Sequence, residues 1–130
     1  MDTPLIIEGS RITDIESLYV ELNRVFMAEE DWTLGPSLDA LHDLLGGGYG
    51  ALQGKGPHCV IWRDFATARA ALGVAATRDW LQQKLAQPNT FNAARITAQL
   101  QALEDGSGPT YFDIVMEIFA DHPDILLRTE

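Results

Sequence analysis

Three short apolar runs, separated by segments of helical periodicity, constrain the fold of this chain more than any other feature. The runs lie at residues 4–8, 58–62 and 124–128. Runs of this length, bounded by glycine, proline and polar residues, are typical of buried strands. Because helical segments separate each run from the next, the strands can pair in parallel through helical crossovers. The order therefore predicts an α/β fold, a three-stranded parallel sheet packed by helices.

The segments between the runs carry apolar side chains at helical spacing. The clearest starts at Thr13, which has the spacing of a capping box with Glu16. Thr110 and Asp113 repeat that signature at the start of a strongly apolar segment, which Pro123 ends. Helices are expected at residues 13–26, 38–45, 64–72, 75–87, 90–104 and 110–121.

Length and composition indicate one domain that spans residues 1–130. With 46% hydrophobic residues, the chain can bury a core without disulfides or metal. Its single cysteine, Cys59, cannot form an internal bridge, which fits a reducing compartment, and its place in a strand favours a small packed hydrophobe. The N-terminal residues lack the basic region of a signal peptide, and no apolar run could span a bilayer. We expect a cytoplasmic protein with no membrane partner.

The charge balance is strongly acidic. The chain has nine Lys and Arg residues and 19 Asp and Glu residues, which gives a formal charge of −10. Such a surface repels nucleic acid phosphates and anionic membranes, so direct nucleic acid binding is not expected. It attracts basic partners and speeds their encounter, although solubility alone would also explain it.

The stretch PSLDALHDLLGG places acids between leucines in a segment that Ser37 can cap at its N-terminus. On a helical wheel, the leucines fall on one side and Asp39, His42 and Asp43 fall on the other. Four explanations remain open at this point: a catalytic pair, a metal site, an acidic contact surface or an ordinary wet face.

Catalysis and metal binding fit these residues poorly. Asp39 and Asp43, one turn apart, point the same way and cannot flank a substrate, and Cys59 has no activating base. Asp39 and His42 have the spacing of half a di-metal motif, but no second copy follows, and His122 borders a strand without a spaced partner. The glycine-rich loop GGGYGALQGKGP follows a helix and lacks the Ser or Thr of a phosphate-binding loop. We therefore predict no catalytic residue, metal or cofactor.

Other acidic residues could extend a contact surface. Asp113, Glu117 and Asp121 form a stripe on the last helix, whose other positions are almost wholly apolar. An acidic run that includes Glu30 and ends at Trp32 precedes the LDALHDLL segment. A largely buried helix still needs one solvent-exposed stripe, so the acidic pattern alone does not establish a binding site. If the two stripes converge in space, they would produce a concentrated negative field.

Four segments together resemble the barstar family of ribonuclease inhibitors. They are IIEGSRITDIESLYVEL, GPSLDALHDLL, VIWRDF and FDIVMEIFADHPDILL, which occur in the order of the family's first strand and helix, second helix, second strand, and last helix and strand. The resemblance covers about residues 5–72 and 111–127. It implies a three-stranded parallel sheet packed by helices, with residues 74–109 as an inserted helical pair.

The resemblance also implies a function and a site. Family members are intracellular, and the founding member blocks the basic active site of a secreted ribonuclease with an acidic helix. By position, Asp39 and Asp43 match the two aspartates of that helix, Asp43 matches the one that imitates a substrate phosphate, and Glu117 matches an acidic residue on the last helix. His42 stands where the family has an aromatic residue.

Three further positions depart from the founding member, and they bear on which nuclease would fit. Thr33 and Leu34 replace its aromatic residues, and Ser37 replaces its asparagine.

The sequence thus predicts a protein that inhibits a basic ribonuclease, or confers immunity to one, and is not an enzyme. The expected contact residues are Asp39, Asp43, His42, Glu117, Trp32 and Glu30. The alternative is a regulatory interaction module of the same fold that does not inhibit and instead uses its inserted helices.

Overall fold

The computed structural model of the protein describes residues 3–54, 56–87 and 92–130, and the predicted α/β architecture is confirmed. The expected start of one helix at residue 90 lies outside the described residues. In chain order the elements are β1 (Leu5–Glu8), η1 (Gly9–Arg11), α1 (Ile15–Phe26), α2 (Leu38–Leu45), η2 (Gly50–Leu52), β2 (His58–Arg63), α3 (Phe65–Ala71), α4 (Val74–Leu85), α5 (Ala93–Asp105), α6 (Tyr111–Ala120) and β3 (Ile125–Thr129).

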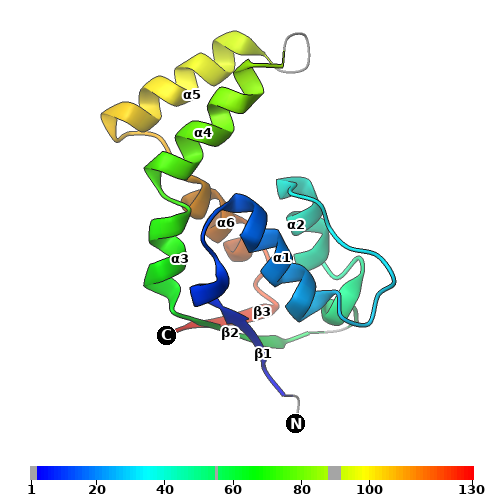
Figure 1. Ribbon diagram of the computed structural model, residues 1–130. Coiled ribbons are helices and arrows are strands. Elements are labelled where there is room, and N and C mark those ends of the chain that lie inside the picture. Colours follow the sequence, from blue (N-terminus) through cyan, green and yellow to red (C-terminus); the bar gives the residue numbers. More distant parts are fainter. Residues whose placement is uncertain (1–2, 55, 88–91) are drawn as a thin grey trace.

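The three strands form one parallel sheet in the order β1-β2-β3. Figure 1 shows α1, α2 and α6 together on one side of this sheet. Side chains alternate accordingly along β2, where Val60 and Trp62 are fully buried. Cys59 points to the open face and is exposed, so the expectation of a packed cysteine is wrong. A strand can be buried on both faces only where helices cover both sides of the sheet.

An aromatic cluster forms the centre of the core. The Trp62 ring lies 5.3 Å from Phe65, 6.1 Å from Phe112 and 5.7 Å from Phe119, measured between ring centroids. These residues join the middle strand to α3 and α6, while the leucine faces of α1 and α2 complete the cluster. Burial of large apolar side chains is the main source of stability in such a core.

Helix caps agree with the sequence at two of three sites. Ser37 caps α2 and Thr110 forms a capping box with Asp113, as predicted. The capping box of α1 is displaced by one residue, because Asp14 Oδ1 accepts the Ser17 N–H at 2.7 Å and Ser17 Oγ accepts the Asp14 N–H at 2.9 Å. Aspartate and serine fill these roles as well as the predicted threonine and glutamate would, so the spacing alone did not locate the helix start.

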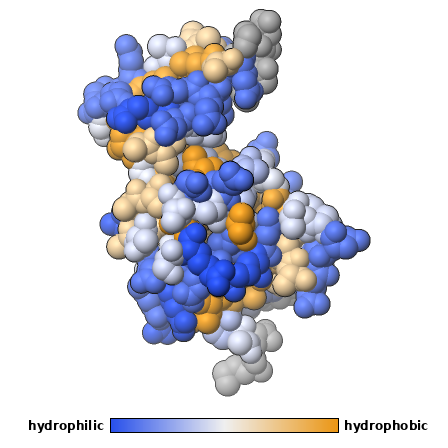
Figure 2. Space-filling model, in the orientation of Figure 1, coloured by the Kyte–Doolittle hydropathy of each residue, from blue (hydrophilic) through white to orange (hydrophobic). Residues whose placement is uncertain are grey.

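Helices α4 and α5 form a hairpin that extends away from the sheet (Figure 1). Leu81, Ile96 and Leu103 make a small core of its own, and Arg78 forms an ion pair with Glu104 across it. Figure 2 shows the surface indented between this hairpin and the body, with hydrophobic residues at the junction. Within the described ranges, no helix has the length and apolar character needed to cross a membrane.

Candidate partner-binding site

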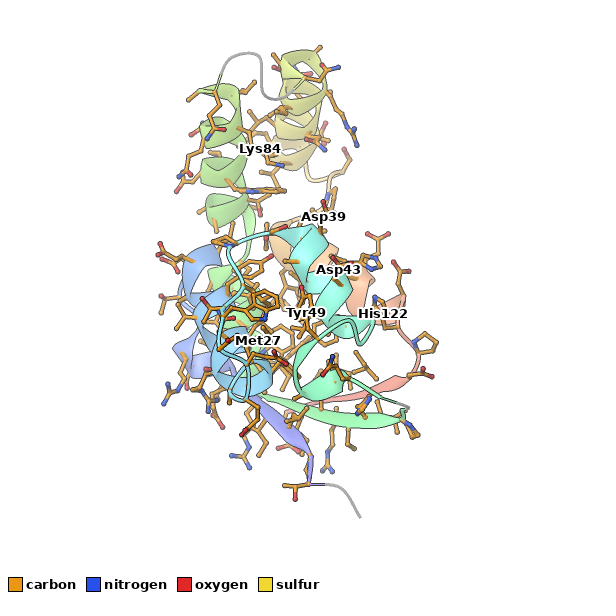
Figure 3. The ribbon with its side chains drawn as sticks, turned by 90° about the vertical axis from the view of Figure 1, so that its right-hand side faces the viewer. Met27, Asp39, Asp43, Tyr49, Lys84 and His122 are labelled. Atoms are coloured by element: carbon orange, nitrogen blue, oxygen red, sulfur yellow. The ribbon has the colours of Figure 1, made fainter. Side chains whose placement is uncertain are left out.

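Helix α2 presents its acidic side chains to solvent because its leucines are buried. Leu41 and Leu44 are completely inaccessible, whereas Asp39, His42 and Asp43 are exposed. The N–H of Ala40 donates to Ser37 Oγ at 3.2 Å, and this cap starts the helix at Leu38, one residue before Asp39. Figure 3 shows Asp39 and Asp43 on successive turns of this short helix.

The loop that follows α2 holds the helix in place. Tyr49 Oη donates to the Ala40 carbonyl at 2.8 Å, and the N–H of Gly50 donates to Glu30 Oε1 at 3.2 Å. Gly50 has φ of +78°, and a side chain there would meet the Phe26 carbonyl at 2.7 Å. Glu30 is half-buried and already has this partner inside the fold, unlike the other acidic candidates.

An aromatic pair flanks α2. The rings of Trp32 and Tyr49 meet edge to face with centroids 4.7 Å apart, and Trp32 remains 43% exposed. Burial, followed by the nearby carboxylate of Asp43, raises the pKa of Tyr49. The pair therefore places an accessible aromatic surface beside the acidic helix, where aromatic side chains often anchor protein partners.

The acidic stripe of α6 lies on the exposed side of that helix. Glu117 and Asp121 are exposed, while Val115, Ile118 and Phe119 face the core. Asp113 is also exposed, but its carboxylate accepts the Thr110 N–H at 3.0 Å as part of the helix cap. The part of the stripe that can serve a partner is thus its C-terminal half.

The two acidic helices pack against each other, and histidines join them. His42 Nδ1 lies 3.0 Å from His122 Nε2, and His42 Nε2 lies 3.5 Å from Asp121 Oδ2. The acidic stripe of α6 and the acidic side of α2 therefore converge in space at this end of α6, which the sequence pattern could not show. His122, a short way before the start of β3, therefore contacts a residue that is far away in the sequence.

The lysines and arginines that the structure describes do not form ion pairs with the acidic side chains of α2 or with Glu117. The ion pairs of Arg24, Arg63, Arg78 and Arg128 are with Glu21, Glu8, Glu104 and Glu130 respectively. Among the residues that the structure describes, no Lys or Arg forms an ion pair with Asp39, Asp43 or Glu117. We call Asp39, Asp43, Glu117 and Asp121 the acidic face. Carboxylates with solvent access and no internal cation retain their full attraction for an external one.

Sequence reasoning missed Tyr49 and His122 as parts of this site. Tyr49 lies in the glycine-rich loop GGGYGALQGKGP, whose pattern bears only on phosphate binding, and His122 is 80 residues from the histidine that it contacts. Neither has a local spacing signal, since both act through contacts between distant segments. Over the described ranges, no group of three or more His, Cys, Asp or Glu side chains is arranged to hold a metal ion.

The fold and this surface together define a small α/β protein with an exposed acidic helix. The family model described as Barstar (barnase inhibitor) matches residues 3–99, about three quarters of the chain, and the chain belongs to this family. No curated protein matches the chain. The matched residues include β1, α1, α2 and β2, whereas α6, β3 and Glu117 lie beyond them. Members of the family are inhibitors and bind a protein partner.

Proposed function

We propose that this protein inhibits a basic ribonuclease, or confers immunity to it, by inserting the exposed side of α2 into the active site of that enzyme. One observation carries the proposal. Asp39 and Asp43 are presented outward by a rigid helix and form no ion pair with a described Lys or Arg. The family description, barnase inhibitor, supports the same function.

The chemistry follows from what a ribonuclease must bind. Its active site holds phosphates with Arg, Lys or His side chains, which donate charge-assisted hydrogen bonds. The carboxylates of Asp39 and Asp43 would accept those bonds in place of phosphate oxygens. Glu117 and Asp121 add to the negative field that draws the basic enzyme in. The protein itself would need no catalytic group and no cofactor.

The neighbouring side chains have supporting roles. His42 is oriented by His122 on one side and Asp121 on the other, so it flanks the acids in one defined position. The exposed part of Trp32 offers an apolar contact at the edge of the acidic face. We further propose that the protein acts in the cytoplasm, because its free thiol, Cys59, is exposed and a reducing compartment protects such a group.

The test compares two variants that each lose one negative charge. Immobilised wild-type protein, Asp43→Asn and Asp64→Asn are used to capture partners from a lysate of the source cells, and the captured fraction is assayed for RNA cleavage. Asp64 is exposed, lies at the start of α3 and has φ of +47°, a conformation that asparagine tolerates. Removing one partner of a desolvated charge pair costs about 2–5 kcal/mol, so Asp43→Asn should retain little ribonuclease.

Circular dichroism and thermal unfolding show whether each variant remains folded. Asp64→Asn should capture as much ribonuclease as the wild type does. Equal capture by folded Asp43→Asn would contradict the proposal and favour a regulatory module that binds through another surface.

A further inference from the structure

A cleft of about 480 Å³ lies where the α4–α5 hairpin joins the body, outside the acidic face. Its walls come from the start of α1, the segment before α2, one side of α4 and the start of α6. The lining residues are Asp14, Ile15, Glu16, Pro36, Ala76, Asp79, Trp80, Gln83 and Tyr111. This volume is within the range of about 300–1,000 Å³ that is typical of binding pockets. The indentation between hairpin and body is visible in Figure 2.

Helix α4 turns one continuous stripe toward this cleft. Ala76, Asp79, Trp80 and Gln83 follow the spacing i, i+3, i+4, i+7, so all four lie on one side of the helix. The stripe is held against the body by a polar contact and an aromatic one. Thr77 Oγ1 accepts the Tyr111 N–H at 2.7 Å, and the Trp80 and Tyr111 rings meet edge to face at 4.8 Å. The wall is therefore fixed by the fold.

The cleft is negatively charged. Asp14, Glu16 and Asp79 line it, and no Lys or Arg appears among the described residues that line it. Hydrogen bonds from the backbone and side chain of Ser17 lower the pKa of Asp14, so its carboxylate stays ionised at neutral pH. All three carboxylates are exposed at the edge of the cleft. A cation that enters would meet several carboxylates, and none of the described lining residues is itself basic.

The apolar part of the lining suits a long side chain with a cationic end. Trp80, Ile15 and Pro36 provide surface on which an aliphatic stem can pack. Lys84 Nζ already lies 3.9 Å from the centroid of the Trp80 ring. Because the Lys84 ammonium already lies over this ring, the indole would offer an incoming side chain contact area. The carboxylates would balance the charge of that side chain.

The cleft also lies close to the acidic face along the chain. Pro36 lines the cleft and Asp39 begins the acidic face, so at most about 11 Å separates their Cα atoms. A protein that covers α2 with an interface of ordinary size, about 800 Å² on each partner, would extend over the cleft as well.

We propose that this cleft is a second binding site, which receives an arginine side chain from the same basic partner that α2 engages. A planar guanidinium can bond to two carboxylates at once while its stem packs on an aromatic ring, which fits this lining better than a compact ammonium does. The site gives the α4–α5 hairpin a function, because α4 supplies one whole wall. The identity of the partner rests on the proposed function, whereas the chemistry of the cleft does not.

The test uses the full ¹⁵N-labelled chain and a blocked tripeptide, acetyl-Gly-Arg-Gly-amide, as the probe. The indole N–H signal of Trp80 is identified with Trp80→Phe and followed by NMR as the peptide is added. A second peptide carries citrulline, which keeps the shape of arginine but has no charge. We expect the arginine peptide to shift the Trp80 signal and the citrulline peptide to leave it in place.

Two variants locate the binding. Asp79→Asn should weaken binding of the arginine peptide by about fivefold, the effect of one exposed charge pair, while Asp64→Asn should leave this binding unchanged. In the capture assay, Asp79→Asn should retain less partner than Asp64→Asn. An unmoved Trp80 signal, equal shifts with citrulline, or an Asp79→Asn variant with wild-type peptide binding and capture would overturn the inference. Since the peptide assay needs no nuclease, its failure is distinct from failure of the Asp43→Asn test.

Discussion

Two buried tyrosines meet through their hydroxyl groups beneath the hairpin. Tyr19 Oη and Tyr111 Oη lie 2.6 Å apart, and both side chains are 1% exposed. Each hydroxyl gives the other a partner in a region where a lone polar group would be costly. Burial raises the pKa of Tyr19, assisted by the neighbouring Tyr111, and burial also raises the pKa of Tyr111.

The raised pKa values of the two tyrosines predict how the free energy of unfolding changes at alkaline pH. Because the folded state holds these protons more tightly than the unfolded chain does, the unfolded state binds fewer protons above about pH 10, and stability must fall there as pH rises. Below the unfolded pKa the stabilisation is fully present. Absorbance at 295 nm should show less tyrosinate at about pH 10.5 in folded protein than in protein unfolded by urea. Coincident titration curves would contradict this assignment.

At the scale of elements, Thr77 joins the hairpin to the last helix. Its side chain is 1% exposed, and Oγ1 donates to the Gly73 carbonyl at 2.7 Å while it accepts the Tyr111 N–H. One hydroxyl thereby satisfies a carbonyl at the start of α4 and an amide at the start of α6. The contact therefore ties the start of α4 to the start of α6.

Replacing Thr77 with valine keeps its shape and removes both hydrogen bonds. The Tyr111 N–H would then be buried without a partner, which should lower the free energy of unfolding by about 1–3 kcal/mol. Thr77→Ser keeps the hydroxyl and is the matched control. Urea unfolding monitored by circular dichroism gives both values, and a valine variant no less stable than the serine variant would show that the contact is unimportant.

Over the molecule as a whole, the excess negative charge is unevenly distributed. The formal charge is −10, and several arginines are paired with glutamates away from the acidic face. On α2 and at Glu117 of α6, the acidic side chains form no ion pair with a described Lys or Arg. A field of this kind acts at a distance and accelerates encounter with a basic protein more than it slows dissociation.

This field predicts a specific salt dependence. The association rate with the captured ribonuclease should fall about tenfold or more as salt rises from about 50 mM to 500 mM, because the Debye length shrinks from roughly 14 Å to 4 Å. The dissociation rate should change much less. Surface plasmon resonance separates the two rates. An association rate that does not respond to salt would mean that the acidic face does not steer the partner.

Much of the fold could be predicted from local patterns. The order of strands and helices was correct because apolar periodicity is a property of each segment by itself. The same holds for the exposed side of α2, since the alternation of leucines with Asp39, His42 and Asp43 leaves one way to bury the helix. Ser37 and Thr110 were found as caps because a cap contacts residues only two or three positions away.

Features that depend on packing between distant segments were decided only by the tertiary structure. The contact between His42 and His122, the cleft between Asp14 and Asp79, and the exposure of Cys59 on the uncovered face of the sheet all belong to this group. Sequence alone determined which side chains α2 and α6 would expose. It did not determine which exposed side chains would become neighbours, because that depends on how helices cross and on which face of the sheet they cover.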